Sequence, residues 1–208
     1  MDVGTSVGKF LVVISLVVPG VLARAQDAWN FPDFSATQVI YTGKVDMPMK
    51  VYRSGSSVRV IQTATISILY VPASRKVYSL TTYPDGSHQC VVMRPEQAGM
   101  IPSPLELVNG TKVERTSAGT EDVEGHSCKV ENVVTTRPDG KTVISKVWEA
   151  TDLQGIPVKI ESQYQSAKIT ALYRDIVVGT PDKALFTPPE KCTPLEKMGQ
   201  VVEHKIIK

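Results

Sequence analysis

Hydrophobic and polar residues alternate along most of this chain, and the alternation is clearest between Glu121 and Tyr164. Within this stretch Val143 and Val147 share one parity, whereas Trp148 falls on the other. A period of two is typical of strands that turn one side to an apolar interior and the other to water. The stretch therefore predicts half-buried strands.

Turn residues separate these strands. Residues 137–141 read Arg-Pro-Asp-Gly-Lys, and residues 152–155 read Asp-Leu-Gln-Gly. Proline presets φ, and glycine adopts the positive φ that tight turns require. The centre of the chain is thus predicted to be an antiparallel meander, and it carries no catalytic group.

The same alternation predicts strands on both sides of the meander. They lie at residues 34–42, 45–51, 58–60, 64–71, 76–82, 88–94, 112–116 and 168–178. About ten strands with two or three short helices, and no strand–helix–strand alternation, indicate a mainly β domain.

Residues 94–110 break the pattern, because they hold three prolines and no period of two. Ser103-Pro104-Leu105-Glu106 has the form of a helix-capping box with proline at the first helical position. The apolar side chains of Leu105, Leu107 and Val108 follow, and we expect them to cover part of the sheet as a lid.

Two further helix-start signals lie near the end of the chain, at residues 180–182 and at Thr193 with Glu196. The tail at 193–208 is predicted to be either a short amphipathic helix or a frayed terminus.

The first 25 residues are typical of a secretory signal peptide. An apolar run from Phe10 to Val18 is followed by Pro19-Gly20 and by a small-x-small cleavage site that ends at Ala25. The run is much shorter than the roughly 20 residues of a membrane-spanning helix. We expect residues 26–192 to form a single domain in the periplasm or outside the cell.

Charge and cysteine content exclude several function classes. Removing the signal leaves 21 basic and 20 acidic residues, interspersed along the chain, so nucleic acid is not an expected partner. The three cysteines are Cys90, Cys128 and Cys192, and two of them can pair in an oxidising compartment. The sequence leaves all three pairings open. No Cys-x-x-Cys spacing indicates a thiol redox site or structural zinc.

Several short patterns together resemble the LolA-like superfamily of exported bacterial domains. They are Gly125-x-x-Cys128, Trp148 followed by Gly155-Ile156-Pro157-Val158-Lys159-Ile160, and a closing Leu185-Phe186-x-x-Pro189. The resemblance covers about Phe34 to Pro189. It implies a strongly curved antiparallel sheet, an unclosed half-barrel, whose apolar concave face is covered by short helices and takes acyl chains in the carriers of the family. The cysteine-bearing tail and the odd cysteine count depart from the carrier pattern.

A ligand on the concave face would contact apolar side chains of the strands and the predicted lid. Methionine is flexible and polarizable and therefore suits varied apolar shapes, although each of these residues also fits ordinary core packing. The predicted ligand-binding residues are Met47, Met49, Ile66, Ile68, Tyr70, Leu105, Leu107, Val108, Trp148 and Val158.

Metal and catalytic chemistry have weaker support. His88 precedes Cys90 by two residues, and His126 precedes Cys128 by two, so sulfur and imidazole share a strand face twice, as Met47 and Met49 share another. Soft sulfur with imidazole suits Cu(I), but nothing in the sequence requires the three pieces to converge. No nucleophile–base motif or phosphate loop is present, so we expect no enzyme and no cofactor.

Three hypotheses follow. The first is an exported protein that holds a lipid, an acyl chain or another hydrophobic ligand in a curved-sheet cavity. The second is an envelope protein that binds a protein partner through its outer face or through the tail after Cys192. The third is a copper-handling protein.

Overall fold

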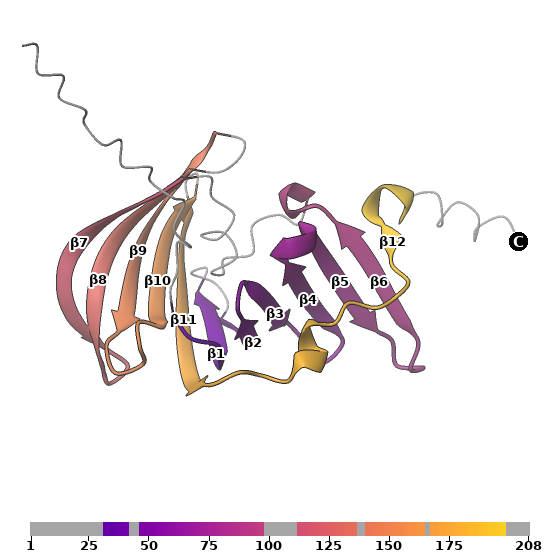
Figure 1. The fold of residues 1–208 in the computed structure, drawn as a ribbon, viewed down its shortest axis with the longest axis horizontal. Coiled ribbons are helices and arrows are strands. Elements are labelled where there is room, and N and C mark those ends of the chain that lie inside the picture. The colour runs from indigo at the N-terminus through magenta and orange to yellow at the C-terminus, as the bar shows by residue number, and fades with distance from the viewer. Residues whose placement is uncertain (1–30, 42–45, 98–111, 137–139, 165–166, 199–208) are drawn as a thin grey trace, which may run out of the picture.

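The described part of this chain is one open sheet. The computed structural model describes residues 31–41, 46–97, 112–136, 140–164 and 167–198. They form a 12-stranded sheet in the order β12-β6-β5-β4-β3-β2-β1-β11-β10-β9-β8-β7 (Figure 1). The ends of this order, β12 and β7, do not pair with each other, so the sheet is not a closed barrel. The predicted mainly β, unclosed architecture is confirmed.

The strands follow the turns that the sequence marks. In chain order they are β1 (Phe34–Tyr41), β2 (Asp46–Ser54), β3 (Ser57–Ile61), β4 (Ile66–Val71), β5 (Lys76–Thr82), β6 (His88–Met93), β7 (Lys112–Val123), β8 (His126–Thr136), β9 (Thr142–Ala150), β10 (Pro157–Tyr164), β11 (Ala167–Val178) and β12 (Thr193–Pro194). All neighbours pair antiparallel except β12, which pairs parallel with β6.

One strand is much longer than its pattern predicts. The alternation indicates residues 112–116, whereas β7 has 12 residues. The register with β8 shifts between Ser117 and Gly119, and Gly119 has φ of 101°. A bulge of this kind inserts a residue and ends the period of two, so the pattern does not reveal the strand beyond it.

The expectation of short helices over the concave face is wrong for the described residues. They contain four 3-10 turns of three or four residues: η1 (Pro72–Ser74), η2 (Pro95–Gln97), η3 (Lys183–Phe186) and η4 (Leu195–Lys197). The signal at residues 180–182 does start η3, where Asp182 accepts a hydrogen bond from the backbone of Ala184. Pro188 and Pro189 follow at once, and proline lacks the backbone donor that a longer helix needs.

Some predictions fall outside the described residues. These are the signal peptide, most of the predicted lid with Leu105, Leu107 and Val108, and the tail beyond residue 198. Among the described residues, no helix is long and apolar enough to cross a membrane.

The two faces of the sheet differ. The largest cluster of buried apolar side chains extends from β5 to β8 on one face, here called the inner face. Two smaller clusters lie around Trp148 on β9 and around Leu69 on β4. Trp148 and Leu69 have the strand parity opposite to that of the large cluster, so they lie on the outer face. Apart from neighbouring strands, the main contacts between elements are those of η3 with β3 and of η4 with β6. The described sheet is thus a single layer.

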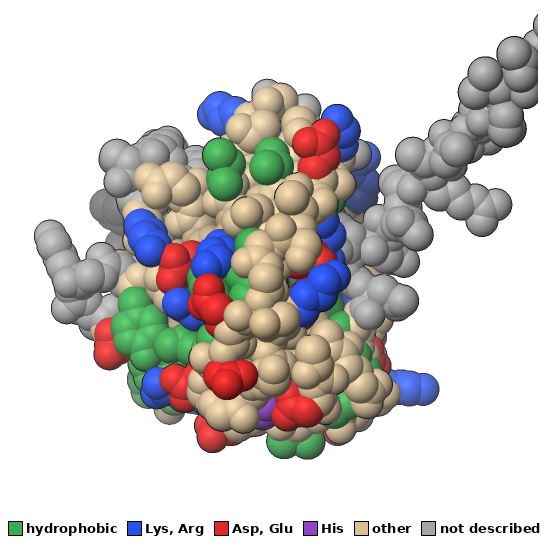
Figure 2. Space-filling view, turned by 90° about the vertical axis from the view of Figure 1, so that its left-hand side faces the viewer, with side chains coloured by type: hydrophobic (Ala, Val, Ile, Leu, Met, Phe, Trp, Pro, Cys, Tyr) green, Lys and Arg blue, Asp and Glu red, His purple; other side chains and the backbone are tan. Residues whose placement is uncertain are grey.

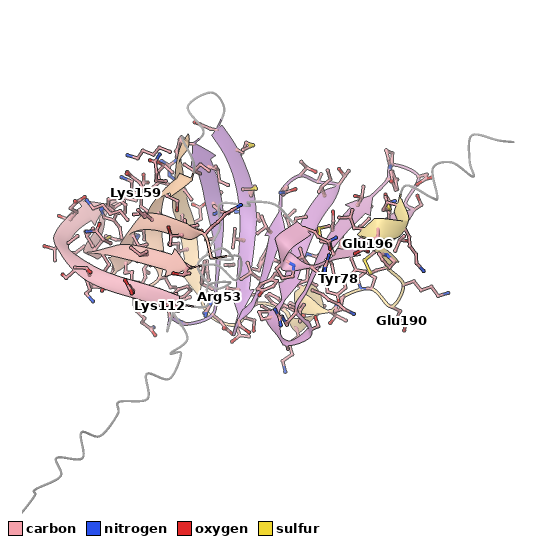
Figure 3. The ribbon with its side chains drawn as sticks, turned by 90° about the horizontal axis from the view of Figure 1, so that it is seen from above. Arg53, Tyr78, Lys112, Lys159, Glu190 and Glu196 are labelled. Atoms are coloured by element: carbon pink, nitrogen blue, oxygen red, sulfur yellow. A yellow bond between two sulfur atoms is a disulfide. The ribbon has the colours of Figure 1, made fainter. Side chains whose placement is uncertain are left out.

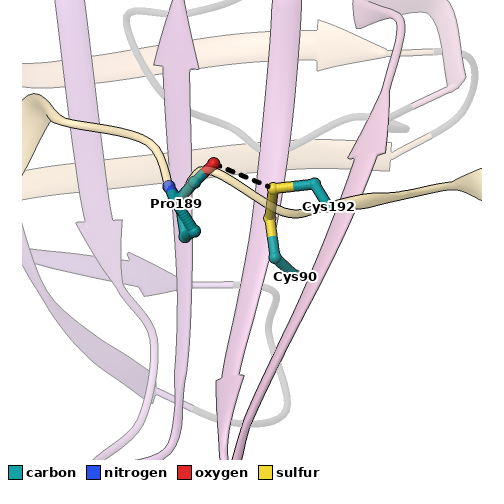
Figure 4. The surroundings of a disulfide bond; sticks show 3 residues. All are labelled: Cys90, Pro189 and Cys192. Atoms are coloured by element: carbon teal, nitrogen blue, oxygen red, sulfur yellow. Dashed lines mark hydrogen bonds between the residues drawn. A yellow bond between two sulfur atoms is a disulfide. The ribbon is translucent and has the colours of Figure 1, made fainter.

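A C-terminal strap, residues 181–198, crosses the outer face of β3 to β6 (Figure 1). A disulfide joins Cys192 of the strap to Cys90 of β6 (Figure 4). Phe186 packs against the cluster of Leu69 and Tyr78, and Arg59 donates a 3.0 Å hydrogen bond to the carbonyl of Leu185. This half of the outer face is therefore covered by the chain's own end.

Candidate functional site

The inner face carries an apolar row that crosses five strands. Successive cross-strand partners are Met47, Ile40, Ala171, Ile160 and Val147, on β2, β1, β11, β10 and β9, and the charged Glu131 of β8 follows Val147. Directly opposed residues lie on the same face of a sheet. At about 4.8 Å per strand, the apolar row spans about 19 Å across the sheet, which is the scale of an extended acyl chain. Ile40, Ala171, Ile160 and Val147 are buried, and Met47 is exposed.

The inner face becomes accessible at the start of β2 and β4. On β2 the exposed fraction falls from 43% at Met47 to 7% at Met49 and 0% at Val51. On β4 it falls from 36% at Ile66 to 9% at Ile68. These two strands lie on either side of β3. An apolar rim that is exposed beside a buried apolar surface is a natural entry point for a hydrophobic ligand.

Aromatic side chains pack at the other end of these strands. The rings of Phe31 and Phe34 lie 5.8 Å apart, and those of Phe34 and Tyr173 lie 6.5 Å apart. The Arg53 guanidinium lies 4.2 Å from the Phe31 ring and also donates to the carbonyls of Phe31 and Pro32. Edge-to-face rings and a cation over a ring stabilise such a cluster. This end of the inner face is packed shut.

Tyr173 also makes a polar contact inside the apolar cluster. Its hydroxyl accepts a 2.8 Å hydrogen bond from the side-chain amide of Gln38, and both residues are buried. Burial raises the pKa of the Tyr173 phenol far above its ordinary value, so the hydroxyl stays neutral. This hydrogen bond links the side chains of β1 and β11.

A charged cluster ends the apolar row at β8. The buried carboxylate of Glu131 pairs with Arg115 of β7 and with Lys129, and Arg115 also pairs with Glu149 of β9. Burial by itself raises the pKa of Glu131, but the hydrogen bonds and charges of Lys129 and Arg115 outweigh it and hold that pKa below its ordinary value. Glu131 is therefore ionised at neutral pH.

Hydroxyl groups lie beside this charged cluster on the inner face. Ser145 of β9 and Ser162 of β10 are cross-strand partners whose hydroxyls are hydrogen-bonded at 2.8 Å. On β8, Thr135 lies two residues after Val133, the cross-strand partner of Ser145. Thr135 is itself opposite Val143 and has no exposed surface. Among the described residues, no group hydrogen-bonds its hydroxyl. Apart from the Gln38–Tyr173 pair, the inner face is thus apolar on β2, β1 and β11, and it is partly polar on β10, β9 and β8.

The structure brings together some of the residues that the sequence predicts. Met49, Ile68 and Tyr70 lie in the inner-face cluster, and Met47 and Ile66 lie at its accessible rim.

Trp148 and Val158 lie elsewhere, in the smaller cluster with Cys128. Trp148 is opposed by Val130 and Lys159, whereas its neighbour Val147 belongs to the inner row. Consecutive strand residues point to opposite faces, so Trp148 faces outward.

Trp148 is held on the outer face by charged neighbours. Its indole nitrogen donates a 2.8 Å hydrogen bond to Glu121, and the ammonium groups of Lys146 and Lys159 lie 4.7 and 4.2 Å from the ring centroid. Figure 3 shows Lys159 among the side chains of this half of the sheet. Figure 2 shows basic and acidic side chains interspersed on the side of the molecule where β7 lies. This surface has no continuous patch of one charge.

The cysteines and histidines of the copper hypothesis are not brought together. Cys90 is in a disulfide, and Cys128 is free and buried; burial raises the pKa of its thiol. The pairs on β6 and β8 stand near opposite ends of the strand order, with Met47 on β2 between them. Across the described ranges, no group of three or more His, Cys, Asp or Glu side chains is placed to hold a metal ion.

Comparisons with known proteins identify only distant structural neighbours. No family model and no curated protein matches this chain. Similar solved structures include MucB, at 17% identity and a TM-score of 0.45, with 78% of this chain and 59% of that chain covered. PNGF-II is similar at 10% identity and a TM-score of 0.45, with 83% and 33% covered. LolA superfamily protein NE2245 from Nitrosomonas europaea is similar at 11% identity and 0.45, with 77% and 92% covered.

The LolA superfamily, which the sequence patterns resemble, is thus represented among the similar solved structures. This chain spans less than two thirds of MucB and about a third of PNGF-II. At these identities and TM-scores the neighbours assign no ligand, partner or site residue to this chain.

Sequence patterns alone did not identify Glu131, Thr135 or the Gln38–Tyr173 pair as inner-face residues. One signal was present, because Gln38 has the same parity as Phe34 and Ile40 within a strand. A polar residue on the buried parity needs a hydrogen-bond partner, and Tyr173 is 135 residues away. No local pattern could have identified that partner.

Proposed function

We propose that this protein is an exported binding protein that holds a hydrophobic ligand, a lipid or an acyl chain, on the inner face of its open sheet. The observation that carries the proposal is the apolar row from Met47 to Val147 on a single-layered sheet. Sheets normally bury an apolar face against a second layer, and no described element forms such a layer over this row. A hydrocarbon chain that entered at the exposed rim of Met47 and Ile66 would lie along this row.

Two further observations support this function. The exposed rim at Met47 and Ile66 gives a ligand access, and the aromatic cluster around Phe34 closes the other end. The disulfide between Cys90 and Cys192 is consistent with an exported protein, because such bonds persist in oxidising compartments.

Native mass spectrometry of protein purified without detergent tests the proposal. We expect a bound mass that extraction with organic solvent removes. A protein that shows only its own mass, and that binds no lipid added afterwards, would contradict the proposal.

Rim variants sharpen this test. A Met47→Asn, Ile66→Asn double variant changes two side chains that are already 43% and 36% exposed, so the fold should survive. We expect it to retain less ligand, because amide groups replace the apolar rim. Ile144→Asn is the matched control: Ile144 is 56% exposed and lies next to Val143 on the opposite face, so its replacement should leave retention unchanged.

A protein partner is the second candidate, and β7 favours it. Among the described strands β7 pairs only with β8, and ten of its 12 residues are exposed. An exposed edge offers backbone donors and acceptors to an extended segment of a partner. Ala118→Pro removes one backbone donor from β7. A partner that the wild-type protein captures and this variant does not would support strand addition. A truncation after residue 198 keeps the strap and tests the tail separately.

A further inference from the structure

We propose that the β8–β10 end of the inner face is a polar subsite, in which the Thr135 hydroxyl donates a hydrogen bond to a carbonyl oxygen of an amphiphilic ligand. The ligand class would then be a fatty acid or its ester, with the hydrocarbon chain on the apolar part of the face. This inference rests on the proposed function and adds to it where the polar end binds.

The Thr135 hydroxyl is buried without a hydrogen-bond partner among the described residues. Its side chain has no exposed surface. Buried hydroxyl groups are nearly always hydrogen-bonded, because leaving one without a partner costs folding free energy. A ligand oxygen beside Thr135 would recover that free energy.

The strand register places Thr135 on the inner face of the sheet. Thr135 shares its strand parity with Val133 and Glu131, and its cross-strand partners are Val113 and Val143. Val133 belongs to the inner-face cluster, and Val113 packs against it. The hydroxyl therefore lies on the face that carries the apolar row, not on the outer face with Trp148.

Other polar and charged side chains lie on the same face at this end of the sheet. Ser145 and Ser162 supply a hydrogen-bonded hydroxyl pair on the adjacent strands, and Glu131 is ion-paired with Arg115 and Lys129. The two cations of this cluster face two carboxylates, Glu131 and Glu149, so the charges balance. Such surroundings favour a dipolar oxygen over a strong net charge, and polar groups set within an apolar wall orient a ligand.

Two fluorescent apolar probes, one with and one without a carboxyl group, test the subsite. Parinaric acid carries a carboxyl group on a polyene chain, whereas diphenylhexatriene is a plain hydrocarbon. We expect Thr135→Val, which keeps the shape and removes the hydroxyl, to bind parinaric acid about threefold to tenfold more weakly and diphenylhexatriene equally well. If Thr135→Val weakens binding of the methyl ester by the same factor, the hydrogen bond goes to the carbonyl oxygen. If it weakens binding of the acid alone, the bond goes to the carboxylate.

Controls separate the possible failures. Thr170→Val makes the same change on β11, where Thr170 is opposed by Glu161 on the outer face, and should change neither affinity. The melting temperature of Thr135→Val should equal or exceed that of the wild type, because the unpartnered hydroxyl is gone. If wild type binds both probes and Thr135→Val binds both equally well, the polar subsite is wrong and the binding function stands. If wild type binds neither probe, both proposals fail.

Discussion

The side-chain amide of Gln38 in β1 donates a 2.8 Å hydrogen bond to the hydroxyl of Tyr173 in β11, and both residues are buried on the inner face. These strands join the N-terminal strands β1–β6 to the meander β7–β11. The bond thus lies where the two halves of the sheet meet.

Tyr173→Phe should lower the free energy of unfolding by about 1–3 kcal/mol, because the buried amide of Gln38 loses this acceptor. Denaturant unfolding measures the change. Tyr83→Phe is the matched control: its hydroxyl bonds Gln89 in an exposed position, so the change should stay within about 0.5 kcal/mol. Equal effects of the two substitutions would contradict the structural role of the Gln38–Tyr173 bond.

Reduction of the disulfide should lower the melting temperature. Cys90 and Cys192 are 102 residues apart. Because closing so long a loop lowers the entropy of the unfolded chain, the disulfide should raise the free energy of unfolding by about 3–5 kcal/mol. Thermal unfolding with and without a dithiol reductant measures the loss. A Cys90→Ser, Cys192→Ser variant should resemble the reduced protein and should not respond to the reductant. A response in that variant would point instead to the buried Cys128.

The stability contributed by Glu131 should depend on pH. Its pKa is lower in the folded protein than its ordinary value of 4.5, despite burial, because Lys129 and Arg115 favour the carboxylate. A lowered folded pKa stabilises the fold above the unfolded value and loses that contribution as the pH falls through the folded value.

Glu131→Gln should therefore be less stable than wild type by about 1–3 kcal/mol at pH 7, and the gap should shrink below pH 4.5. Urea unfolding at pH 7, 5, 4 and 3 gives the gap directly. A gap that is constant over this range would mean that the carboxylate charge contributes nothing.

Trp148→Phe should destabilise the protein by about 1–2 kcal/mol without changing ligand retention. The substitution removes the hydrogen bond to Glu121 and weakens the contacts with Lys146 and Lys159, all on the outer face. Chemical unfolding and native mass spectrometry measure the two quantities. Loss of ligand in a folded Trp148→Phe protein would show that the ligand reaches the outer cluster.

Much of the fold could be predicted because strand alternation and turn chemistry are local. Pro-Asp-Gly at residues 138–140 and the glycines of other turns mark where strands end, and the strands then follow. Prediction stopped where local rules conflict. The bulge between Ser117 and Gly119 interrupts the alternation, so the pattern predicts only the first part of β7. Prolines after Phe186 restrict the expected helix to a 3-10 turn.

The candidate site was predicted less well, since alternation identifies two faces without saying which one is inner. Met49, Ile68 and Trp148 all have apolar side chains at strand positions, but only the register places Trp148 on the face opposite the other two. A shift of one residue in register exchanges the faces of a whole strand.

The sequence by itself determined the class of fold, the positions of most strands and the presence of enough apolar side chains to form a core, because these depend on periods and turns within a few residues. The tertiary structure decided that Cys90 pairs with Cys192, that the strap covers the outer face, and that Glu131 ends an apolar row beginning at Met47. These relationships join residues about 80 or more positions apart, and only the pairing of distant strands brings them together.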